Sequence, residues 1–359
     1  MSESAVLPSA AAMEGQGGYN RNSQVQAGGM SPALPMLERA VSAATLPAEP
    51  QPIVIADYGC SEGRNSLAPM QAAIRILRQR VEQDRAIAVV HTDLPGNDFT
   101  VLFQTLIESP ESYLRKDAAV YPSAVGRSFY EQILPPNSVT VGWSSWAVQW
   151  LSRTPAIIPD HVHYSLTKDA AVRGAFSRQS AEDWENFLHS RGRELCPGGR
   201  LAVVTMAVDD QGDFGYGSLS DAMYGTLIEM VDSGFISAQE LRHMCIPTVG
   251  RSRADFLAPF VGGRFSGLSV EEVEIFFAED RFYSDYEQHG NAQEFGARWA
   301  GFSRASAFPT FARCLEGGST SARAAEFIAR METGMATRVA AKPEPQRIPL
   351  GRILVAKEY

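Results

Sequence analysis

Short apolar runs alternate with helical patterns along the first part of the chain. Two runs, Ile53–Asp57 and Ile87–His91, are apolar and rich in β-branched residues, which is typical of strands buried on both faces of a sheet. The segment Ala68–Gln83 between them repeats apolar residues at helical spacing. A strand, a helix and a second strand in this order predict a βαβ unit, and therefore a parallel sheet with helices on its faces.

Further elements flank this unit. A short helical pattern, Pro35–Ala44, precedes the first strand, and two more strands are expected at Ser138–Trp143 and Arg200–Thr205. An amphipathic helix, Ser180–Leu195, comes between these strands and ends in the turn that begins at Cys196 with Cys-Pro-Gly-Gly. The pattern therefore indicates the α/β fold class.

The pattern changes in the last part of the chain. Residues 212–263 are helical and loop-like without a long apolar strand, and further helices are expected around residues 290–340. Late strands at Val270–Phe277 and Arg352–Lys357 return the chain to the sheet. We therefore expect residues 19–359 to form one α/β domain, a Rossmann-like sheet with an α-helical cap.

The start of the chain has a different composition. Residues 1–18 are rich in Ser, Ala and Gly and have no apolar period, so we expect them to be disordered. The first residues also lack the basic start and apolar core of a secretory signal. Elsewhere no stretch approaches the roughly 20 apolar residues that a membrane span needs.

Composition and charge narrow the class of partner. The chain has 359 residues, of which 45% are hydrophobic and 20% charged, as in an ordinary globular protein. Its net charge of −9 argues against a nucleic acid as partner, and we expect no membrane partner either. The cysteines show no CxxC spacing, which favours a reduced, cytoplasmic protein over a disulfide framework or a zinc site. They are Cys60, Cys196, Cys245 and Cys314.

A glycine turn follows the first strand, with the sequence Asp57-Tyr-Gly59-Cys-Ser61-Glu-Gly. Such a turn lets the backbone approach a ligand and aims a helix N-terminus at it, although an ordinary βα turn has the same composition. The dinucleotide pattern GxGxxG is not met, because Ser61 and Arg64 stand where its second and third glycines would be. The closing carboxylate and the small residues after it suit S-adenosylmethionine better.

The second strand ends in two carboxylates, Asp93 and Asp98. A carboxylate at this strand tip can accept both hydroxyls of a ribose, and Leu94 can cover an adenine face. The alternative is that these aspartates cap the following helix. We assign the ribose to Asp93 and the helix cap to Asp98.

The chain resembles the SABATH methyltransferases, which esterify salicylic, benzoic and related acids or methylate xanthines. The matching motifs occur in the family's order. They are Y-x-x-N-S-x-x-Q from Tyr19, I-A-D-x-G-C-S-x-G-x-N from Ile55, D-L-P-G-N-D-F from Asp93, S-F-Y from Ser128, S-S-x-x-x-x-W-L-S from Ser144, P-G-G from Pro197 and I-P from Ile246. The resemblance implies a class I methyltransferase fold, S-adenosyl-L-methionine as cofactor and a homodimer.

Carried over residue by residue, the resemblance also implies a methyl-donor site. Its residues are Tyr19, Asn22, Cys60, Asn65, Asp93, Leu94, Ser128 and Phe129, with Asp57 and Gly59 from the glycine turn and Gln26 at the border with the acceptor. Cys60 would then be a packing position beside the cofactor. Plain core is the alternative for Phe129, since aromatic residues prefer the interior anyway.

The resemblance sets Gln26 and Trp150 against the carboxylate of the methyl acceptor. An amide and an indole N–H are neutral donors, so they can orient a carboxylate without neutralising its nucleophilic oxygen. A carboxylic acid is already ionised at pH 7 and needs no general base. The predicted catalytic residues are therefore Gln26 and Trp150, which act through alignment, with no acid/base pair and no metal.

Departures from the family pattern leave the acceptor open. Trp146 stands where carboxylate-methylating relatives usually have Tyr, and Gln149 where they often have Met or His. The family's aromatic wall is missing near Leu219 and Ser220. We expect all four to line the acceptor site together with Gln26 and Trp150. A ring nitrogen or phenolic oxygen therefore stays an alternative acceptor to the carboxylate of a small aromatic, indolic or isoprenoid acid.

Two other residue clusters resemble metal sites, and two other functions compete with methyl transfer. The sequence around His161 and His163 replaces a family motif, and we interpret this H-x-H as a polar loop because no third metal ligand is near. We expect the acidic cluster at Asp209, Asp210 and Asp213 to solvate a loop. A nicotinamide-dependent oxidoreductase on the same sheet, and a relative that binds its ligand without catalysis, remain rival functions.

Overall fold

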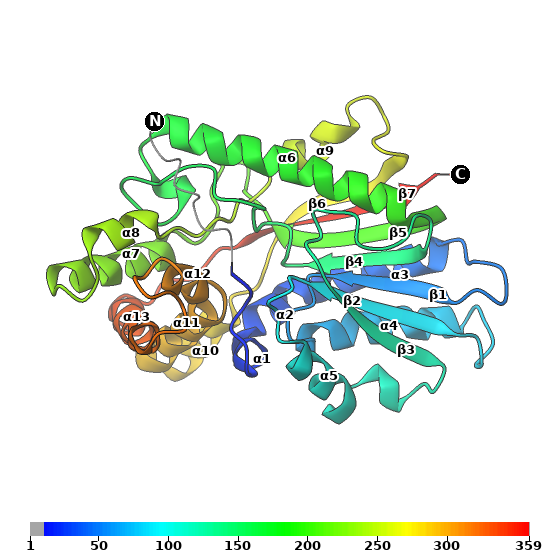
Figure 1. The fold of residues 1–359 in the computed structure, drawn as a ribbon, viewed down its shortest axis with the longest axis horizontal. Helices are drawn as coiled ribbons and strands as arrows, with labels where there is room; N and C mark the ends of the chain where they lie inside the picture. The colour runs from blue at the N-terminus through cyan, green and yellow to red at the C-terminus, as the bar shows by residue number, and fades with distance from the viewer. Residues whose placement is uncertain (1–10, 359) are drawn as a thin grey trace.

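The computed structural model describes residues 11–358, which form a seven-stranded sheet in the order β3-β2-β1-β4-β5-β7-β6 (Figure 1). The strands are β1 Ile53–Tyr58, β2 Ile87–Asp93, β3 Val120–Gly126, β4 Val139–Ser145, β5 Leu195–Met206, β6 Leu268–Phe277 and β7 Pro349–Lys357. The first five run parallel, and β7 lies antiparallel between β5 and β6. The predicted Rossmann-like α/β sheet is confirmed.

Helices cover both faces of the sheet and one of its ends. They are α1 Gly18–Asn22, α2 Gln24–Met30, α3 Leu34–Ala43, α4 Leu67–Arg78, α5 Phe99–Glu108, α6 Ala170–Glu194, α7 Gly217–Asp232, α8 Ala238–His243, α9 Arg253–Leu257, α10 Arg281–His289, α11 Ala292–Ser306, α12 Phe308–Ala312 and α13 Ala322–Ala341. The alternation of β1 explains the two layers. Ile53 and Ile55 belong to the core that α3, α4 and α5 close, whereas Ala56 and Tyr58 belong to the core that α6 closes (Figure 1).

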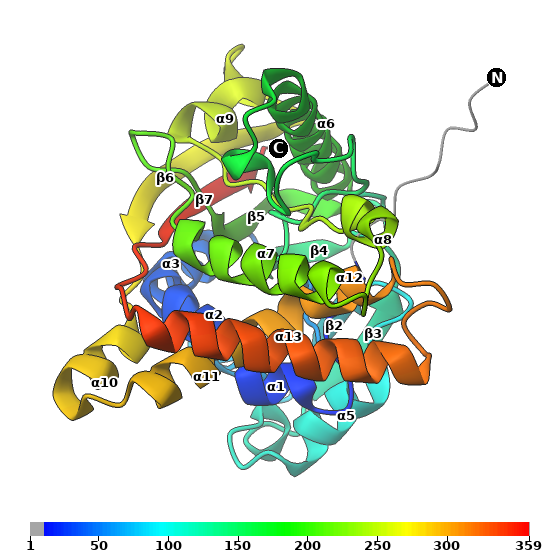
Figure 2. The ribbon, with the colours of Figure 1, turned by 90° about the vertical axis from the view of Figure 1, so that its left-hand side faces the viewer.

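The remaining helices form a cap beyond the end of β5. Helices α7 and α8 follow β5 in the chain, and α10 to α13 lie between β6 and β7. Figure 2 shows these helices gathered at this end of the molecule. They share one aromatic and methionine-rich core with residues such as Met223, Trp299, Phe311 and Phe327. The short helix α9 lies in the segment 212–263 that we expected to be cap, but its Phe256 packs into the core of the sheet instead.

Several elements differ from the sequence prediction, among them α6, which begins at Ala170 rather than at Ser180. Strand β3 was not predicted, because it is an edge strand whose side chains are mostly exposed or half-buried and which contains Pro122. Helix α4 ends at Arg78, short of the predicted Gln83. Strand β5 already begins at Leu195, and the predicted Cys-Pro-Gly-Gly turn is an irregularity in its pairing with β4.

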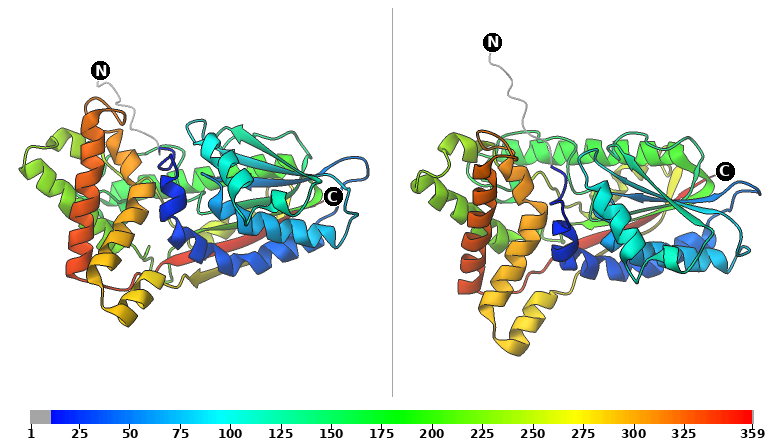
Figure 3. Two further views of the ribbon diagram at one scale, coloured as in Figure 1. Left: turned by 90° about the horizontal axis from the view of Figure 1, so that it is seen from below. Right: turned by 60° about the horizontal axis from the view of Figure 1, so that its bottom comes forward.

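The N-terminal segment also differs from expectation over residues 11–17. Residues 1–10 lie outside the described residues, but the backbone N–H groups of Glu14 and Gly17 donate to Ala305 O and to the Glu62 carboxylate, at 3.0 and 2.7 Å. Glu14 also forms an ion pair with Arg304. These contacts join the segment to the cap and to the glycine turn. Helix α1, which follows, lies between the cap and the sheet (Figure 3).

No helix within residues 11–358 combines the length and the apolar character that crossing a membrane requires. The four cysteines are unpaired thiols, and Cys60 and Cys245 are buried.

Candidate active site

The glycine turn after β1 is held against the tips of two neighbouring strands. The N–H groups of Gly59 and Cys60 both donate to Thr92 O at the end of β2, at 2.8 and 3.0 Å. Gly59 has a φ of 91°, and a Cβ there would lie 2.4 Å from the Cβ of Ala147, which follows β4. Only glycine fits both the backbone conformation and this close approach.

Asp93, the last residue of β2, closes one side of the turn. Its Oδ2 accepts from the N–H of Ser61 and its Oδ1 from the N–H of Leu94, each at 2.7 Å. Burial is the main cause that raises the pKa of Asp93 to about 6. Asp98 caps α5 by accepting from the N–H of Val101 at 3.1 Å, so the helix-cap role predicted for it is confirmed.

A cavity opens above the turn, and we call it the sheet-side cavity. Its lining residues are Ala11, Ala12, Met13, Tyr19, Gly59, Ser61, Asp93, Leu94, Ser128, Phe129, Tyr130, Trp146, Ala147, Trp150, Leu151 and Ser152. Six of the residues predicted for the methyl-donor site are among them, brought together from α1 and from the ends of β1, β2 and β3. They are Tyr19, Gly59, Asp93, Leu94, Ser128 and Phe129.

Asp57 was also predicted for this site, but it does not line the cavity. Its Oδ2 accepts from the Ser66 hydroxyl at 2.5 Å and lies 2.9 Å from Nδ1 of His91. The other ring nitrogen of His91 lies 2.9 Å from the hydroxyl of Tyr113. Asp57 therefore anchors a buried polar chain beneath the glycine turn.

Three further donor-site residues lie behind the cavity rather than in its wall. The Asn22 side chain donates to Gly18 O at 3.0 Å and faces Gly301 of α11. The Asn65 side chain donates to Ser23 O at 3.3 Å and so connects the turn to the N-terminal helices. Cys60 packs in the core of the sheet, where burial raises the pKa of its thiol.

A second cavity, the cap-side cavity, lies between the strand ends and the cap. Its lining residues are Met13, Tyr19, Gln26, Trp146, Gln149, Trp150, His163, Met206, Phe214, Tyr216, Leu219, Ser220, Met223, Ile246, Thr248, Phe302, Ser303, Ser306 and Ala307. All six residues predicted to bind the acceptor are among them, namely Gln26, Trp146, Gln149, Trp150, Leu219 and Ser220. Four residues line both cavities: Met13, Tyr19, Trp146 and Trp150.

The side-chain amides of two acceptor-site residues differ in how far they are hydrogen-bonded within the protein. Both ends of the Gln149 amide are engaged, since its NH2 group donates to Trp146 O at 2.6 Å and its oxygen accepts from the Thr205 hydroxyl at 2.7 Å. The amide oxygen of Gln26 is buried and has no hydrogen-bond partner among the described residues. Gln149 is therefore part of the scaffold, whereas Gln26 has hydrogen-bonding capacity left for a ligand.

Trp146 is held in an unusual conformation at the wall between the cavities. Its φ is 54°, in the left-handed region that only a few per cent of non-glycine residues occupy. Its N–H donates to Val204 O at 2.9 Å, and its indole ring lies against Gly29 of α2, where a Cβ would come within 2.6 Å of Cζ2. The indole is thus fixed by the strand ends on one side and by α2 on the other.

The charges around the cap-side cavity are few. None of the described residues that line it is an Asp, Glu, Lys or Arg. Its titratable groups are two tyrosines, Tyr19 and Tyr216, whose pKa burial raises, and His163, whose pKa burial lowers to about 3. The cavity therefore has no described group that would accept a proton at neutral pH.

The histidines of the H-x-H motif lie in a loop, as the sequence suggested, but this loop is buried. His161 and His163 are both buried, and His163 stacks on Phe214 with ring centroids 4.5 Å apart. The described residues contain no group of three possible metal ligands. The aspartates at 209, 210 and 213 do lie in a mostly exposed loop after β5, where Asp209 accepts from the N–H groups of Gln211 and Asp213.

Several lining residues escaped the sequence analysis. Met13 lies in the segment expected to be disordered, and Phe302, Ser303 and Ser306 lie on α11, far along the chain from the motifs. Helical periodicity marks such positions as buried, but it does not distinguish a core residue from a cavity wall.

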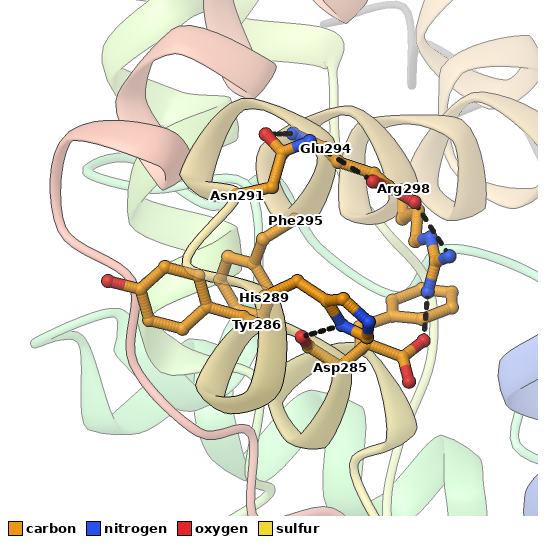
Figure 4. Close-up of a pocket in the computed structure, with 8 residues that line it drawn as sticks. Asp285, Tyr286, His289, Asn291, Glu294, Phe295 and Arg298 are labelled. Atoms are coloured by element: carbon orange, nitrogen blue, oxygen red, sulfur yellow. Dashed lines mark hydrogen bonds and ion pairs between the residues drawn. The ribbon is translucent and has the colours of Figure 1, made fainter.

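A further hollow lies between α10 and α11, away from these cavities (Figure 4). Its polar side chains are already paired with one another. Arg298 binds Asp285 and Glu294, and Asn291 donates to Glu294 at 3.1 Å. His289 has its Nδ1 2.9 Å from Asp285 O. These pairs leave little polar capacity that a ligand would need to satisfy, in contrast to Gln26.

Comparisons with known proteins point to one family. A family model described as SAM dependent carboxyl methyltransferase matches residues 9–343. Salicylate carboxymethyltransferase of Clarkia breweri is 28% identical over 311 residues, which cover 82% of this chain and 84% of that protein. Methyltransferase FUS9 of Gibberella moniliformis is 29% identical over 245 residues, which cover 68% of this chain and 65% of that protein.

The chain thus aligns with slightly less than two thirds of the length of this fungal relative. Among solved structures, loganic acid methyltransferase with SAH has a TM-score of 0.75 and 21% sequence identity, covering 97% of this chain and 99% of that one. At this level of identity the likeness shows a shared fold.

Proposed function

Because the chain belongs to the family of S-adenosylmethionine-dependent carboxyl methyltransferases, we propose that it methylates the carboxylate of a small aromatic, indolic or isoprenoid acid. The observation that carries this proposal is the wall that the two cavities share. A methyl donor in the sheet-side cavity and an acid in the cap-side cavity would meet at Tyr19, Trp146 and Trp150. Methyl transfer requires this juxtaposition of two small molecules.

The sheet-side cavity offers the groups that S-adenosylmethionine needs. The Asp93 carboxylate can accept the two ribose hydroxyls, and Leu94 beside it can cover one face of the adenine. The hydroxyl of Ser61 is buried without a partner among the described residues, which leaves it available to the polar methionine part. When bound, the cofactor supplies a methyl group on a positively charged sulfur, which leaves as a neutral thioether.

Gln26 and Trp150 are proposed to orient the acceptor. The NH2 group of Gln26 and the indole N–H of Trp150 are neutral donors on residues that line the cap-side cavity, and they suit the two oxygens of a carboxylate. Neutral donors hold the carboxylate without forming an ion pair that would lower its nucleophilicity. Alignment of the attacking oxygen with the methyl carbon and exclusion of water by the surrounding aromatic residues then supply the rate acceleration.

The titratable groups of the cap-side cavity favour a carboxylate over a phenol or a ring N–H as the methyl acceptor. A phenol or a ring N–H has to lose a proton when it is methylated, and the imidazole of His163, with its pKa at about 3, is too weak a base to take it. A carboxylate is already ionised at neutral pH. Moreover, the amide of Gln149, which could have read the edge of a heterocycle, is engaged by Trp146 and Thr205.

The test is to incubate the protein with methyl-labelled S-adenosylmethionine and a panel of aromatic, indolic and isoprenoid acids, followed by mild base. We expect labelled products that release their label as methanol, as methyl esters do. Label that survives base would contradict carboxylate methylation and favour a ring nitrogen or an ether oxygen. Tight cofactor binding without any product would favour a relative that does not catalyse.

Two substitutions test the assigned roles. Gln26→Ala and Trp150→Ala should each weaken acceptor use by about 1–3 kcal/mol, the usual cost of an unmade buried hydrogen bond. Gln24→Ala, on the exposed side of the same helix α2, is the matched control and should leave the kinetics unchanged. Unchanged acceptor kinetics in both the Gln26 and the Trp150 variants would remove this assignment.

The proposal includes a cytoplasmic location and a homodimer. Four unpaired thiols are consistent with a reducing compartment, and the dimer is carried over from the family resemblance alone. Fractionation of the source cells and light scattering of the purified protein would test the two points. Recovery of the protein from an oxidising compartment would contradict the first point, and the mass of a monomer would contradict the second.

A further inference from the structure

The loop with His163 and the loop with Thr248 meet at the acceptor side of the cap-side cavity. Nε2 of His163 lies 3.3 Å from the hydroxyl of Thr248, and both residues line the cavity. His163 is the only hydrogen-bond partner of that hydroxyl among the described residues. The pair lies outside the motifs of the family resemblance, and its histidine belongs to the segment where this chain departs from them.

The direction of this hydrogen bond follows from the other side of the ring. Nδ1 of His163 accepts from the backbone N–H of Ser165 at 3.4 Å, which caps the short helical turn that follows, and the Ser165 hydroxyl, 2.7 Å from the same nitrogen, then donates to it as well. A backbone N–H can only donate, so Nδ1 carries no proton and the neutral ring has its hydrogen on Nε2. Nε2 therefore donates to the Thr248 oxygen, and the hydrogen of that hydroxyl is left to point elsewhere.

The position of Thr248 relative to Trp150 shows where that hydrogen can go. The two residues face each other in an isolated antiparallel bridge, flanked by the bonds from Leu151 N to Pro247 O and from Val249 N to Gln149 O, at 2.8 and 2.9 Å. Directly opposed residues in such a pair have their side chains on the same face, about 5 Å apart at Cβ. The hydroxyl of Thr248 is thus next to the indole that we assign to the carboxylate.

Thr248 also differs from Trp150 in the cavities that it lines. Trp150 lines both cavities, whereas Thr248 lines only the cap-side cavity. An atom that meets Thr248 therefore belongs to the acceptor's body rather than to the oxygen that receives the methyl group.

We infer that Thr248, oriented by the neutral ring of His163, is a specificity-determining donor that binds an oxygen atom on the acceptor close to its carboxylate. The inference rests on the proposed function and narrows it to acids that carry a hydroxyl or carbonyl group near the carboxyl carbon. His163 is a positioning residue here, because it acts through Thr248. An acceptor without this oxygen leaves a buried hydroxyl unpaired, which is the basis of the discrimination.

The experiment compares acids that differ by one oxygen. Benzoate and its 2-hydroxy and 3-hydroxy derivatives, and phenylacetate with its α-hydroxy and α-keto derivatives, would be assayed for kcat/KM as base-labile methyl esters. We expect the wild-type protein to prefer one oxygen-bearing acid over its parent by about tenfold or more, as one hydrogen bond allows. Thr248→Val should reduce this preference to within about threefold, because kcat/KM falls more for the oxygen-bearing acid than for its parent.

Two further variants separate this role from a structural one. Thr248→Ser keeps the hydroxyl and should keep the preference. His163→Phe keeps the ring against Phe214 but removes Nε2–H, and the double variant with Thr248→Val should lose no more preference than Thr248→Val alone. Equal affinity for SAH in all variants establishes that the fold is intact.

The outcomes are distinct. A preference that survives in Thr248→Val, a parallel loss of both acids, or a wild-type protein that favours no oxygen-bearing acid would overturn the inference and leave the carboxyl methyltransferase proposal standing. If no acid in any panel gives a base-labile ester, the proposed function itself falls, and the inference with it.

Discussion

The two cavities are built in different ways, although they share a wall. The sheet-side cavity has its floor on the tips of parallel strands, and its turn is fixed by backbone bonds such as those from Gly59 and Cys60 to Thr92. The cap-side cavity is assembled from loops and helices between Met13 and Ala307, mostly through side chains. The shape of the first cavity is thus set by backbone contacts at the strand tips, whereas the second takes its shape from side chains of segments that are far apart in the chain. The first suits the methyl donor, which we propose to be S-adenosylmethionine in every reaction. The second suits the acceptor, whose structure differs between related enzymes.

The largest effect is expected from a substitution that disturbs the backbone of the glycine turn under the sheet-side cavity. Gly59→Ala would bring a Cβ within 2.4 Å of Ala147 at a φ of 91°. We expect the free energy of unfolding to fall by about 2–4 kcal/mol and the affinity for SAH to fall by about a hundredfold or more. Thermal unfolding and calorimetric titration with SAH would measure the two effects.

A matched control exists in the loop after β5. Gly212 has a φ of 79°, but an added Cβ there meets nothing within 4 Å. Gly212→Ala should therefore cost only about 1 kcal/mol of backbone strain and leave the affinity for SAH unchanged. Equal effects of the two substitutions would contradict the importance of the contact with Ala147.

The next largest effect is expected from the carboxylate of the sheet-side cavity. Asp93→Asn removes the charge that we assign to the ribose hydroxyls, and the affinity for SAH should fall by about 1.5–3 kcal/mol, or roughly 10- to 150-fold. Asp98→Asn is the control from the same segment, because asparagine is as good a helix cap as aspartate. It should bind SAH as the wild type does. If both variants bind equally well, Asp93 does not hold the ribose.

The pH dependence of binding gives a smaller but specific effect. Because burial raises the pKa of Asp93 to about 6, the ionised form that accepts two hydroxyl donors predominates only above that pH. The affinity for SAH should rise by about tenfold from pH 5 to 7, then level off, and Asp93→Asn should abolish the rise. The pH dependence of folding stability has the opposite sign to that of SAH binding. The unliganded protein favours the protonated carboxyl, so the contribution of Asp93 to stability declines as the pH rises from about 4 to 6.

The smallest effect on ligand binding is expected at Gln149, although it lines the cap-side cavity. Gln149→Met leaves Trp146 O and the Thr205 hydroxyl without a partner, which should cost about 1–3 kcal/mol of unfolding free energy. The KM for the acceptor should change by no more than about threefold. A large change in acceptor choice with unchanged stability would show that the amide reads the acceptor directly.

The same contrast explains what the sequence could predict. The buried strands β1 and β2 and the residues at their tips are contiguous motifs, so the α/β sheet, Gly59 and Asp93 followed from local pattern, and the family match confirms the SABATH resemblance. The roles of individual residues remain predictions. Among the predicted donor residues, Asp57 lies outside the cavity wall because its carboxylate is turned toward Ser66 and His91, a choice that depends on tertiary neighbours.

Fewer residues of the cap-side cavity could be predicted from the sequence. The sequence pointed to Leu219 and Ser220 through the resemblance, but Phe302 and Ser306 look like ordinary helical positions until α11 is packed against the strand ends. His163 does lie in a loop, but its burial was not predicted, because it depends on Phe214 and Thr248, which are far from it in the chain. Contacts between distant segments decide these positions, and periodicity does not report them.

The left-handed backbone of Trp146 bears on how readily such a protein could evolve toward other acids. Shrinking a buried tryptophan normally costs about 3–5 kcal/mol, but at a φ of 54° a change to glycine also relieves backbone strain of about 1 kcal/mol or more. A larger acceptor cavity is therefore more accessible to mutation here than elsewhere in its wall. A Cβ at position 29 would come within 2.6 Å of both the indole and Cδ1 of Leu350, so a smaller residue 146 removes one of the two obstacles to varying residue 29, and the change at 146 is favoured as the first of the two in a lineage.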